Sequence, residues 1–192
     1  MPSPFNAPRF VKDERALCDL LLSLKLTTCP QCQRTGALIG HGFLRGYAEK
    51  DSESASAVRG RRFFCSNRGR RPGCGRTFSV QFESVLCCFV VGTLTLWCFV
   101  QAVLSGLTRR AAWLREARDV LSLSSAYRLW RRLGTAQSAL RSRLCSEAPA
   151  PACASREPLA QLAGHLTVVL GDGQPDLLAA YQHHMQRGVF DR

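Results

Sequence analysis

The spacing of apolar and polar positions changes along the chain and divides its first half into distinct segments. Leucines recur at helical spacing over residues 13–26, and Asp13 stands where an N-cap belongs, which predicts a short helix. Residues 27–84 hold short β-prone runs among many glycines and arginines, which is typical of β-hairpins. The polar segment 48–57 is expected to form a flexible loop between two hairpins.

The second half has a helical pattern. Residues 85–107 are strongly apolar, and two segments with helical periodicity and basic faces follow, over 108–121 and 124–144. Two further short helices are expected near 158–169 and 175–187. The predicted fold class is small α+β, with an N-terminal helix (1–26), a ribbon of β-hairpins (27–84), a mainly helical region (85–145), a Pro-, Ala- and Ser-rich linker (146–158) and a helical tail (159–192).

Positive charge is concentrated in two blocks. The formal net charge is +12. Residues 27–84 carry 10 basic and 4 acidic side chains, a net +6, and residues 105–145 carry 9 and 2, a net +7. Two local basic blocks predict a polyanion as partner, and a solubilising surface is the alternative interpretation.

The chain contains ten cysteines, which is many for its length of 192 residues. The first residues carry proline and charge where a secretion signal would have an apolar core. We therefore expect a cytoplasmic protein in a reducing compartment, where cysteines bind metal or are buried as small apolar residues. Cys87, Cys88 and Cys98 lie in an apolar run and are expected in a core.

Four of the cysteines have the spacing of a metal site. Cys29 and Cys32 form a C-x2-C pair, and Cys65 and Cys74 follow on a predicted hairpin. Two such pairs can complete a tetrahedral site for Zn²⁺, which supplies the stability that a domain this small lacks. Pro30 stiffens the first turn. The sequence predicts a zinc site with the ligands Cys29, Cys32, Cys65 and Cys74.

Alternatives to this ligand set remain open at the level of sequence. The second pair has C-x8-C spacing, so its loop is an enlarged knuckle with arginines pushed outward. His41 is a candidate substitute ligand. A redox C-x-x-C site is the rival interpretation of Cys29 and Cys32, but the strand-then-helix pattern of such sites is absent around them.

The motifs CPQC, GHGFLRG, RRFFCSN and CGRTFSV resemble the zinc ribbon at the N-terminus of insertion-sequence transposases, where a helix-turn-helix follows. The likeness covers residues 27–84 well and 85–133 in outline. The chain is also similar to short regulators of such elements, which lack the catalytic domain. The resemblance implies a transposon-associated regulator, or an accessory or truncated transposase. The long 33–64 segment and the C-x8-C spacing depart from the family pattern.

A helix-turn-helix can also be derived from the residues themselves. Gly106 precedes Thr108, a good N-cap, and Ala111 and Ala112 are small enough for close helix crossing. We expect Trp113 and Leu114 in the core. The next helix would start at Ser122 or Ser124 and bury a stripe of small and apolar residues at Ala126, Leu129, Trp130 and Leu133.

DNA is the predicted partner, with RNA as the alternative, and a second copy of the chain or a transposase is the expected protein partner. An ordinary basic helical hairpin with solvated charges is the alternative interpretation. The predicted nucleic-acid-binding residues are basic or aromatic and lie in the two basic blocks: Arg61, Arg62, Arg68, Arg70, Arg71, Arg76, Arg109, Arg110, Tyr127, Arg128, Arg131 and Arg132.

Two other function classes compete with DNA binding. The 25 residues between Glu83 and Arg109 carry no charge, so the alternative function is a zinc-ribbon protein anchored by one transmembrane helix at about 85–107. Phosphoryl-transfer catalysis needs clustered carboxylates on a sizeable sheet. Only 47 residues follow Cys145, and their acidic residues form no convincing cluster. We therefore expect no enzymatic activity.

Overall fold

The computed structural model describes residues 5–46, 57–117 and 121–191, and the chain divides into two compact units, Met1–Glu83 and Ser84–Arg192. The expected loop at 48–57 lies outside the described residues except for Ala57. The strands before and after it pair with each other, so it connects two strands of one hairpin instead of two hairpins.

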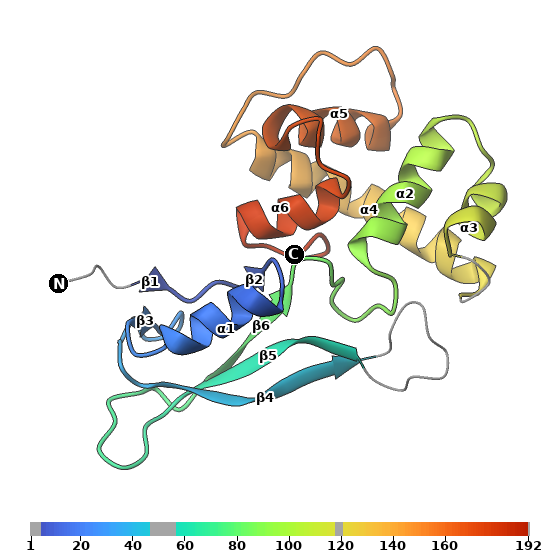
Figure 1. Cartoon of the computed structure of the whole chain (residues 1–192). Helices are drawn as coiled ribbons and strands as arrows, with labels where there is room; N and C mark the ends of the chain where they lie inside the picture. The colour runs from blue at the N-terminus through green and yellow to red at the C-terminus, as the bar shows by residue number, and fades with distance from the viewer. Residues whose placement is uncertain (1–4, 47–56, 118–120, 192) are drawn as a thin grey trace. The chain divides into compact units, whose positions relative to one another are not determined.

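The first unit combines short strands, one helix and a four-stranded sheet (Figure 1). A two-stranded sheet pairs β1 with β3 in parallel, and the larger sheet has the order β2-β6-β5-β4. In the larger sheet β2 runs parallel to β6, and the other pairs are antiparallel. In chain order the elements are β1 (Phe5–Asn6), β2 (Phe10–Val11), α1 (Glu14–Leu22), β3 (Thr27–Thr28), β4 (Leu38–Gly46), β5 (Ala57–Cys65) and β6 (Thr77–Phe82).

Helix α1 begins where the sequence predicts. The Asp13 side chain accepts a hydrogen bond from the Ala16 amide at 2.8 Å, which satisfies a free N–H of the first turn. Leu17 and Leu20 of this helix are buried. Helix α1 contacts β2, and both belong to the same unit as β4–β6.

Strands β5 and β6 bury alternate residues. Phe63 and Val80 are fully buried, whereas Arg62 and Ser79, which directly precede them in the chain, are exposed. Because side chains point to opposite faces of a strand in turn, one face of this sheet forms the interior of the unit and the other faces solvent.

The core around the cysteines is small. It consists of Cys29, Ala37, Leu38 and Cys65, with a few half-buried neighbours. Two of these four buried residues are cysteines, so the apolar side chains alone provide little burial at this end of the unit.

The second unit is a bundle of helices around one core (Figure 1). Each helix contributes a buried side chain, for example Phe99, Trp113, Leu129, Leu162 and Tyr181. The last two helices therefore share a core with the earlier ones. The helices are α2 (Thr93–Leu104), α3 (Arg109–Ala117), α4 (Leu123–Leu144), α5 (Pro158–Leu170) and α6 (Leu177–Met185).

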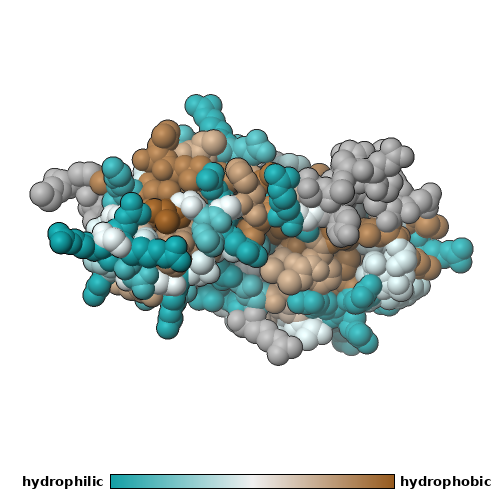
Figure 2. Space-filling view, turned by 90° about the horizontal axis from the view of Figure 1, so that it is seen from below, coloured by the Kyte–Doolittle hydropathy of each residue, from teal (hydrophilic) through white to brown (hydrophobic). Residues whose placement is uncertain are grey.

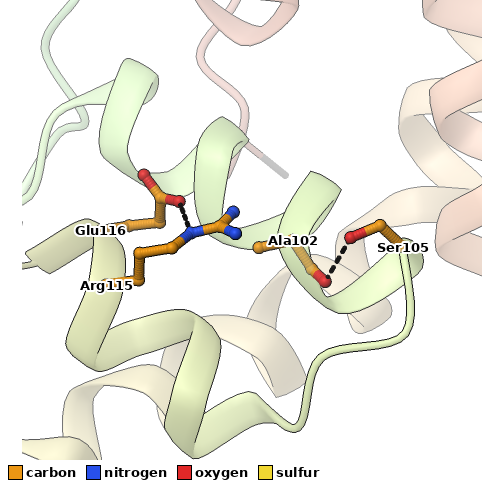
Figure 3. Close-up of polar contacts among 4 residues, drawn as sticks. All are labelled: Ala102, Ser105, Arg115 and Glu116. Carbon is orange, nitrogen blue, oxygen red and sulfur yellow. Dashed lines mark hydrogen bonds and ion pairs between the residues drawn. The ribbon is translucent and has the colours of Figure 1, made fainter.

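Local details of α2 and α3 agree with the sequence in part. Thr108 Oγ1 accepts from the Ala111 amide at 3.2 Å, which confirms the predicted cap. Figure 3 shows Ser105 Oγ donating to the Ala102 carbonyl at 2.9 Å, at the end of α2. Trp113 is buried as expected. Leu114, which the sequence placed in the core, is 50% exposed because it follows Trp113 directly and points to the outer side of α3.

The buried stripe of α4 also holds in part. Ala126, Leu129 and Leu133 are buried. Trp130 is only half-buried, and its ring lies under the Arg109 guanidinium, with the Cζ atom 5.0 Å from the ring centroid. The indole therefore contributes to the surface as well as to the core.

The uncharged segment 85–107 folds as a helix only over α2, from Thr93 to Leu104. Cys87 and Cys88, which were expected in a core, precede this helix and are exposed, and Cys98 is half-buried. Half of the residues of α2 are buried, and Leu96, Phe99 and Val100 among them belong to the core of the second unit. Across residues 5–46, 57–117 and 121–191, no helix combines the length and the apolarity that a membrane crossing requires.

Candidate metal centre and basic surface

Four cysteine sulfur atoms converge in the first unit. Cys29 and Cys32 follow β3, Cys65 is the last residue of β5, and Cys74 lies before β6. The Sγ atoms of Cys29 and Cys74 are 3.9 Å apart, and those of Cys32 and Cys65 are 3.7 Å apart. All four Sγ atoms lie within 4.8 Å of one another. The four predicted ligands thus form a group that could hold one metal ion.

His41 does not join this group. It is exposed on β4, and its ring centroid lies 5.8 Å from that of Phe64. In the described part of the chain, the group of side chains that could hold a metal ion consists of these four cysteines. Because four sulfur atoms meet instead of two, the arrangement also favours a metal site over a two-cysteine redox centre.

The loop after Cys29 is held by two backbone hydrogen bonds and by one bond from a backbone amide to sulfur. The Cys29 amide donates to the Arg34 carbonyl at 2.9 Å, and the Gln33 amide donates to the Cys29 carbonyl at 2.8 Å. The Gln31 amide donates to Cys29 Sγ at 3.4 Å. The tight turn therefore directs an N–H at the sulfur, and such a bond stabilises a thiolate.

The loop after Cys65 repeats this pattern on a longer scale. The Cys65 amide donates to the Arg76 carbonyl at 2.9 Å, and the Gly75 amide donates to the Cys65 carbonyl at 2.9 Å. The bonded residues are 11 and 10 positions apart in the chain, whereas the corresponding residues of the first loop are 5 and 4 positions apart. Each separation is therefore six residues greater in the second loop. The Cys74 amide also donates to Cys65 Sγ at 3.3 Å. The second loop is therefore a C-x2-C knuckle that carries six additional residues.

The six additional residues are Asn67–Pro72, which we call the arginine loop. The Gly73 amide donates to the Ser66 carbonyl at 3.0 Å and closes its base. A Cβ atom on Gly73 would lie 2.2 Å from that carbonyl oxygen, so only glycine permits this closure. At the tip, the Arg71 amide donates to the Arg68 carbonyl at 3.2 Å. The arginine loop is therefore held by a backbone hydrogen bond at its base and by another at its tip.

Two arginines brace the two knuckles against each other. Arg34 Nη1 donates to the Pro72 carbonyl at 2.6 Å, and Arg76 Nη1 donates to Gln31 Oε1 at 3.2 Å. Arg34 lies five residues after Cys29, and Arg76 lies five residues after Cys65 when the six residues of the arginine loop are not counted. Sequence reasoning missed Arg34, and its only signal was this matched offset.

The surroundings of the cysteines shift the pKa values of their thiols in different directions. Burial raises the pKa of the Cys65 thiol to about 12, and burial also raises the pKa of Cys29. A backbone hydrogen bond from Arg34 lowers the pKa of Cys32 to about 7. Without metal, Cys32 is the group that ionises first near neutral pH, whereas Cys29 and Cys65 stay protonated.

Metal affinity is expected to rise with pH as a result. Cys29 and Cys65 must each lose a proton on binding at pH 7, so the affinity should increase by about tenfold per pH unit for each proton released. Below the Cys32 pKa of about 7, release of the Cys32 proton adds to the slope. Competition with a chelator between pH 6 and 8, combined with calorimetry in buffers of different ionisation enthalpy, measures this proton release. An affinity that does not change with pH would contradict the protonation of Cys29 and Cys65 in the metal-free protein.

The predicted nucleic-acid-binding arginines of the first unit are mostly exposed. Arg61 is half-buried, with its Cζ atom 4.8 Å from the ring centroid of the exposed Phe43. In Figure 2 hydrophilic side chains project between apolar areas of the surface. The exposed members of the set are Arg62, Arg68, Arg70, Arg71 and Arg76.

The six predicted residues of the second unit differ in their surroundings, although all are exposed. Arg109, Tyr127, Arg128 and Arg131 line one groove together with Trp130. Arg110 is exposed on α3. The guanidinium of Arg132 lies between two aromatic rings, 4.8 Å from the centroid of Phe89 and 5.0 Å from that of Phe190.

No family model, curated protein or solved structure matches this chain.

Proposed function

We propose that the chain is a non-catalytic, zinc-dependent DNA-binding protein, and that it acts as a transposon-associated regulator or as an accessory or truncated transposase. The observation that carries the proposal is the four-cysteine group from which the exposed arginine loop, Asn67–Pro72, projects. A metal at this position would fix the base of a loop whose side chains suit phosphate groups.

The distances between sulfur atoms support zinc as the metal. A Zn–S bond of about 2.3 Å in a regular tetrahedron places the sulfur atoms about 3.8 Å apart. The Cys29–Cys74 and Cys32–Cys65 pairs, at 3.9 Å and 3.7 Å, lie on either side of this value. A closed set of four thiolates leaves no coordination position for a substrate, which is typical of structural zinc sites.

Helices α2, α3 and α4 support a helix-turn-helix. Helix α3 packs against both α2 and α4, and the first half of α4 presents exposed Tyr127, Arg128 and Arg131. In such motifs the second helix of the pair enters the major groove with residues near its N-terminus. We assign this role to α4. Arg132 is engaged with Phe89 and Phe190, so we assign it to packing.

Substitution of Arg128 or Arg131 by alanine is expected to weaken binding to a preferred duplex by about 1–3 kcal/mol, and binding to scrambled DNA by much less. The reason is that a bidentate contact to a guanine edge is lost only at the preferred site. The preferred sequence is selected from random duplexes, and affinities are then compared on the selected and scrambled sequences.

Arg115→Ala is the matched control for these variants. It removes the same charge from α3, but its Nε atom already pairs with Glu116 Oε1 at 2.6 Å (Figure 3). We expect its affinity for both sequences to stay close to that of the wild type. Equal losses in all three variants would leave a non-specific polyanion binder, and no duplex binding at low salt would overturn the proposed function.

A further inference from the structure

One face of the sheet formed by β4, β5 and β6 is open to solvent. On β5, Arg62 and Phe64 alternate with residues of the buried face. Their cross-strand partners on β6 are Ser79 and Thr77, and both are exposed. We call this side of the sheet the open face.

Phe64 stands at the centre of polar and cationic side chains on the open face. The His41 ring centroid lies 5.8 Å from that of Phe64, at an interplanar angle of 40°. Arg68 of the arginine loop places its Cζ atom 5.8 Å from the same ring centroid. Strands β4, β5 and β6 contain no acidic residue. The open face therefore combines an aromatic ring with positive charge and carries no carboxylate from its own strands.

This combination suits an unpaired nucleic-acid strand better than a duplex. In a duplex the faces of the bases are covered by their neighbours in the stack, whereas an unpaired strand exposes them to aromatic side chains. Guanidinium groups beside the ring can contact the phosphates that connect successive bases. A half-buried aromatic ring on the open side of a basic sheet is explained by such a ligand, and phosphate contacts alone would not require it.

We propose that the open face binds unpaired DNA bases, with a base stacked on Phe64 beside His41 and with Arg62 and Arg68 contacting the flanking phosphates. The inference rests on the proposed DNA-binding function and names its substrate as DNA that contains an unpaired segment, such as a melted or frayed end.

The test uses the full chain with its metal and two probes, a single-stranded oligothymidylate and a duplex of the same length. Phe64→Leu removes the aromatic ring and keeps an apolar side chain, so the affinity for the single strand should fall about fivefold or more. The salt dependence should keep its slope because no charge is removed. Affinity for the duplex should not change. His41→Ala, at an exposed position, should weaken single-strand binding in the same direction.

Phe43→Leu is the matched control. Phe43 is 51% exposed on the same hairpin, and it pairs with Arg61, which belongs to the opposite face of β5 from Phe64. Its single-strand affinity should equal that of the wild type, and metal content should be the same in all variants.

The outcomes separate the two proposals. If the wild type binds duplex but Phe64→Leu and His41→Ala bind the single strand as well as the wild type does, the open-face proposal is wrong and the proposed function stands. Equal losses in Phe43→Leu and Phe64→Leu also overturn it. If the wild type binds only the single strand, and does so through Phe64, the open-face proposal holds and duplex recognition is wrong.

Discussion

Replacement of Cys65 by serine is expected to abolish metal binding and to unfold the cysteine-bearing part of the first unit, while the second unit stays folded. Cys65 is fully buried, and its sulfur belongs to both the metal group and the small core around it. Structural zinc contributes about 10–16 kcal/mol of apparent binding free energy in small domains, as much as the whole stability of a typical protein. The few apolar residues near the site cannot replace this contribution.

The sequence provides a convenient probe for this prediction. All three tryptophans, Trp97, Trp113 and Trp130, lie in the second unit. Tryptophan fluorescence of Cys65→Ser should therefore match that of the wild type, whereas amide hydrogen exchange in β4–β6 should become fast and metal analysis should find no zinc.

The control for this experiment is Cys18→Ser. Cys18 is an exposed cysteine of the same unit, on α1, and it is not a member of the metal group. This variant should keep its metal and its slow exchange. Retention of zinc by Cys65→Ser would show that the metal site does not depend on the Cys65 sulfur. Identification of iron in the wild type would contradict the assignment of zinc.

The metal group could be predicted from sequence because its signal is local. Cys29 and Cys32 lie on one turn, and Cys65 and Cys74 flank one loop that follows a β-prone run, so residue type and spacing predicted the four ligands and left His41 as a candidate substitute. The start of α1 was predictable for the same reason, since Asp13 caps residues only three positions away. The helices expected near 158–169 and 175–187 are confirmed as α5 and α6.

The remaining features depend on partners that are distant in the chain. Strands β1, β2 and β3 are two residues long, which is too short for an alternating pattern, and β2 forms only because β6 lies beside it. The Arg34 side chain is positioned by the carbonyl of Pro72. Arg132 is exposed as its helix pattern indicates, but that pattern could not reveal its contact with Phe190.

The C-x8-C spacing, which departs from the zinc-ribbon pattern, is explained by the arginine loop. The hydrogen bond between Ser66 and Gly73 closes the base of the arginine loop. Without the loop, Cys65, Ser66, Gly73 and Cys74 are equivalent to a C-x2-C knuckle. The arginine loop is thus an addition to a regular knuckle, and its three arginines raise the local positive charge without altering the ligand set. This separation of metal binding from charge can be tested by removing the loop.

Deletion of Asn67–Pro72 is expected to leave the metal in place and to weaken DNA binding strongly. The Gly73 amide and the Ser66 carbonyl are already 3.0 Å apart, so the chain can be rejoined there with a small backbone shift. The deletion removes Arg68, Arg70 and Arg71, all of them exposed. If each contacts one phosphate of a duplex, the slope of log affinity against log salt should fall by about 2.7, because each neutralised phosphate contributes about 0.9. The loss should be equal for preferred and scrambled sequences, since phosphate contacts carry no sequence information.

A variant with Arg68, Arg70 and Arg71 replaced by glutamine keeps the length of the arginine loop and should reproduce the change in slope. Agreement between the deletion and this charge-neutral loop would assign the effect to the guanidinium groups, because the two variants share only the loss of charge. Salt titrations of both variants against the wild type, with metal content measured in parallel, make the comparison. Loss of zinc in the deletion alone would show that the arginine loop supports the knuckle. An unchanged slope in both variants would show that the arginine loop contacts no phosphate and that the DNA is bound elsewhere, for example on the second unit.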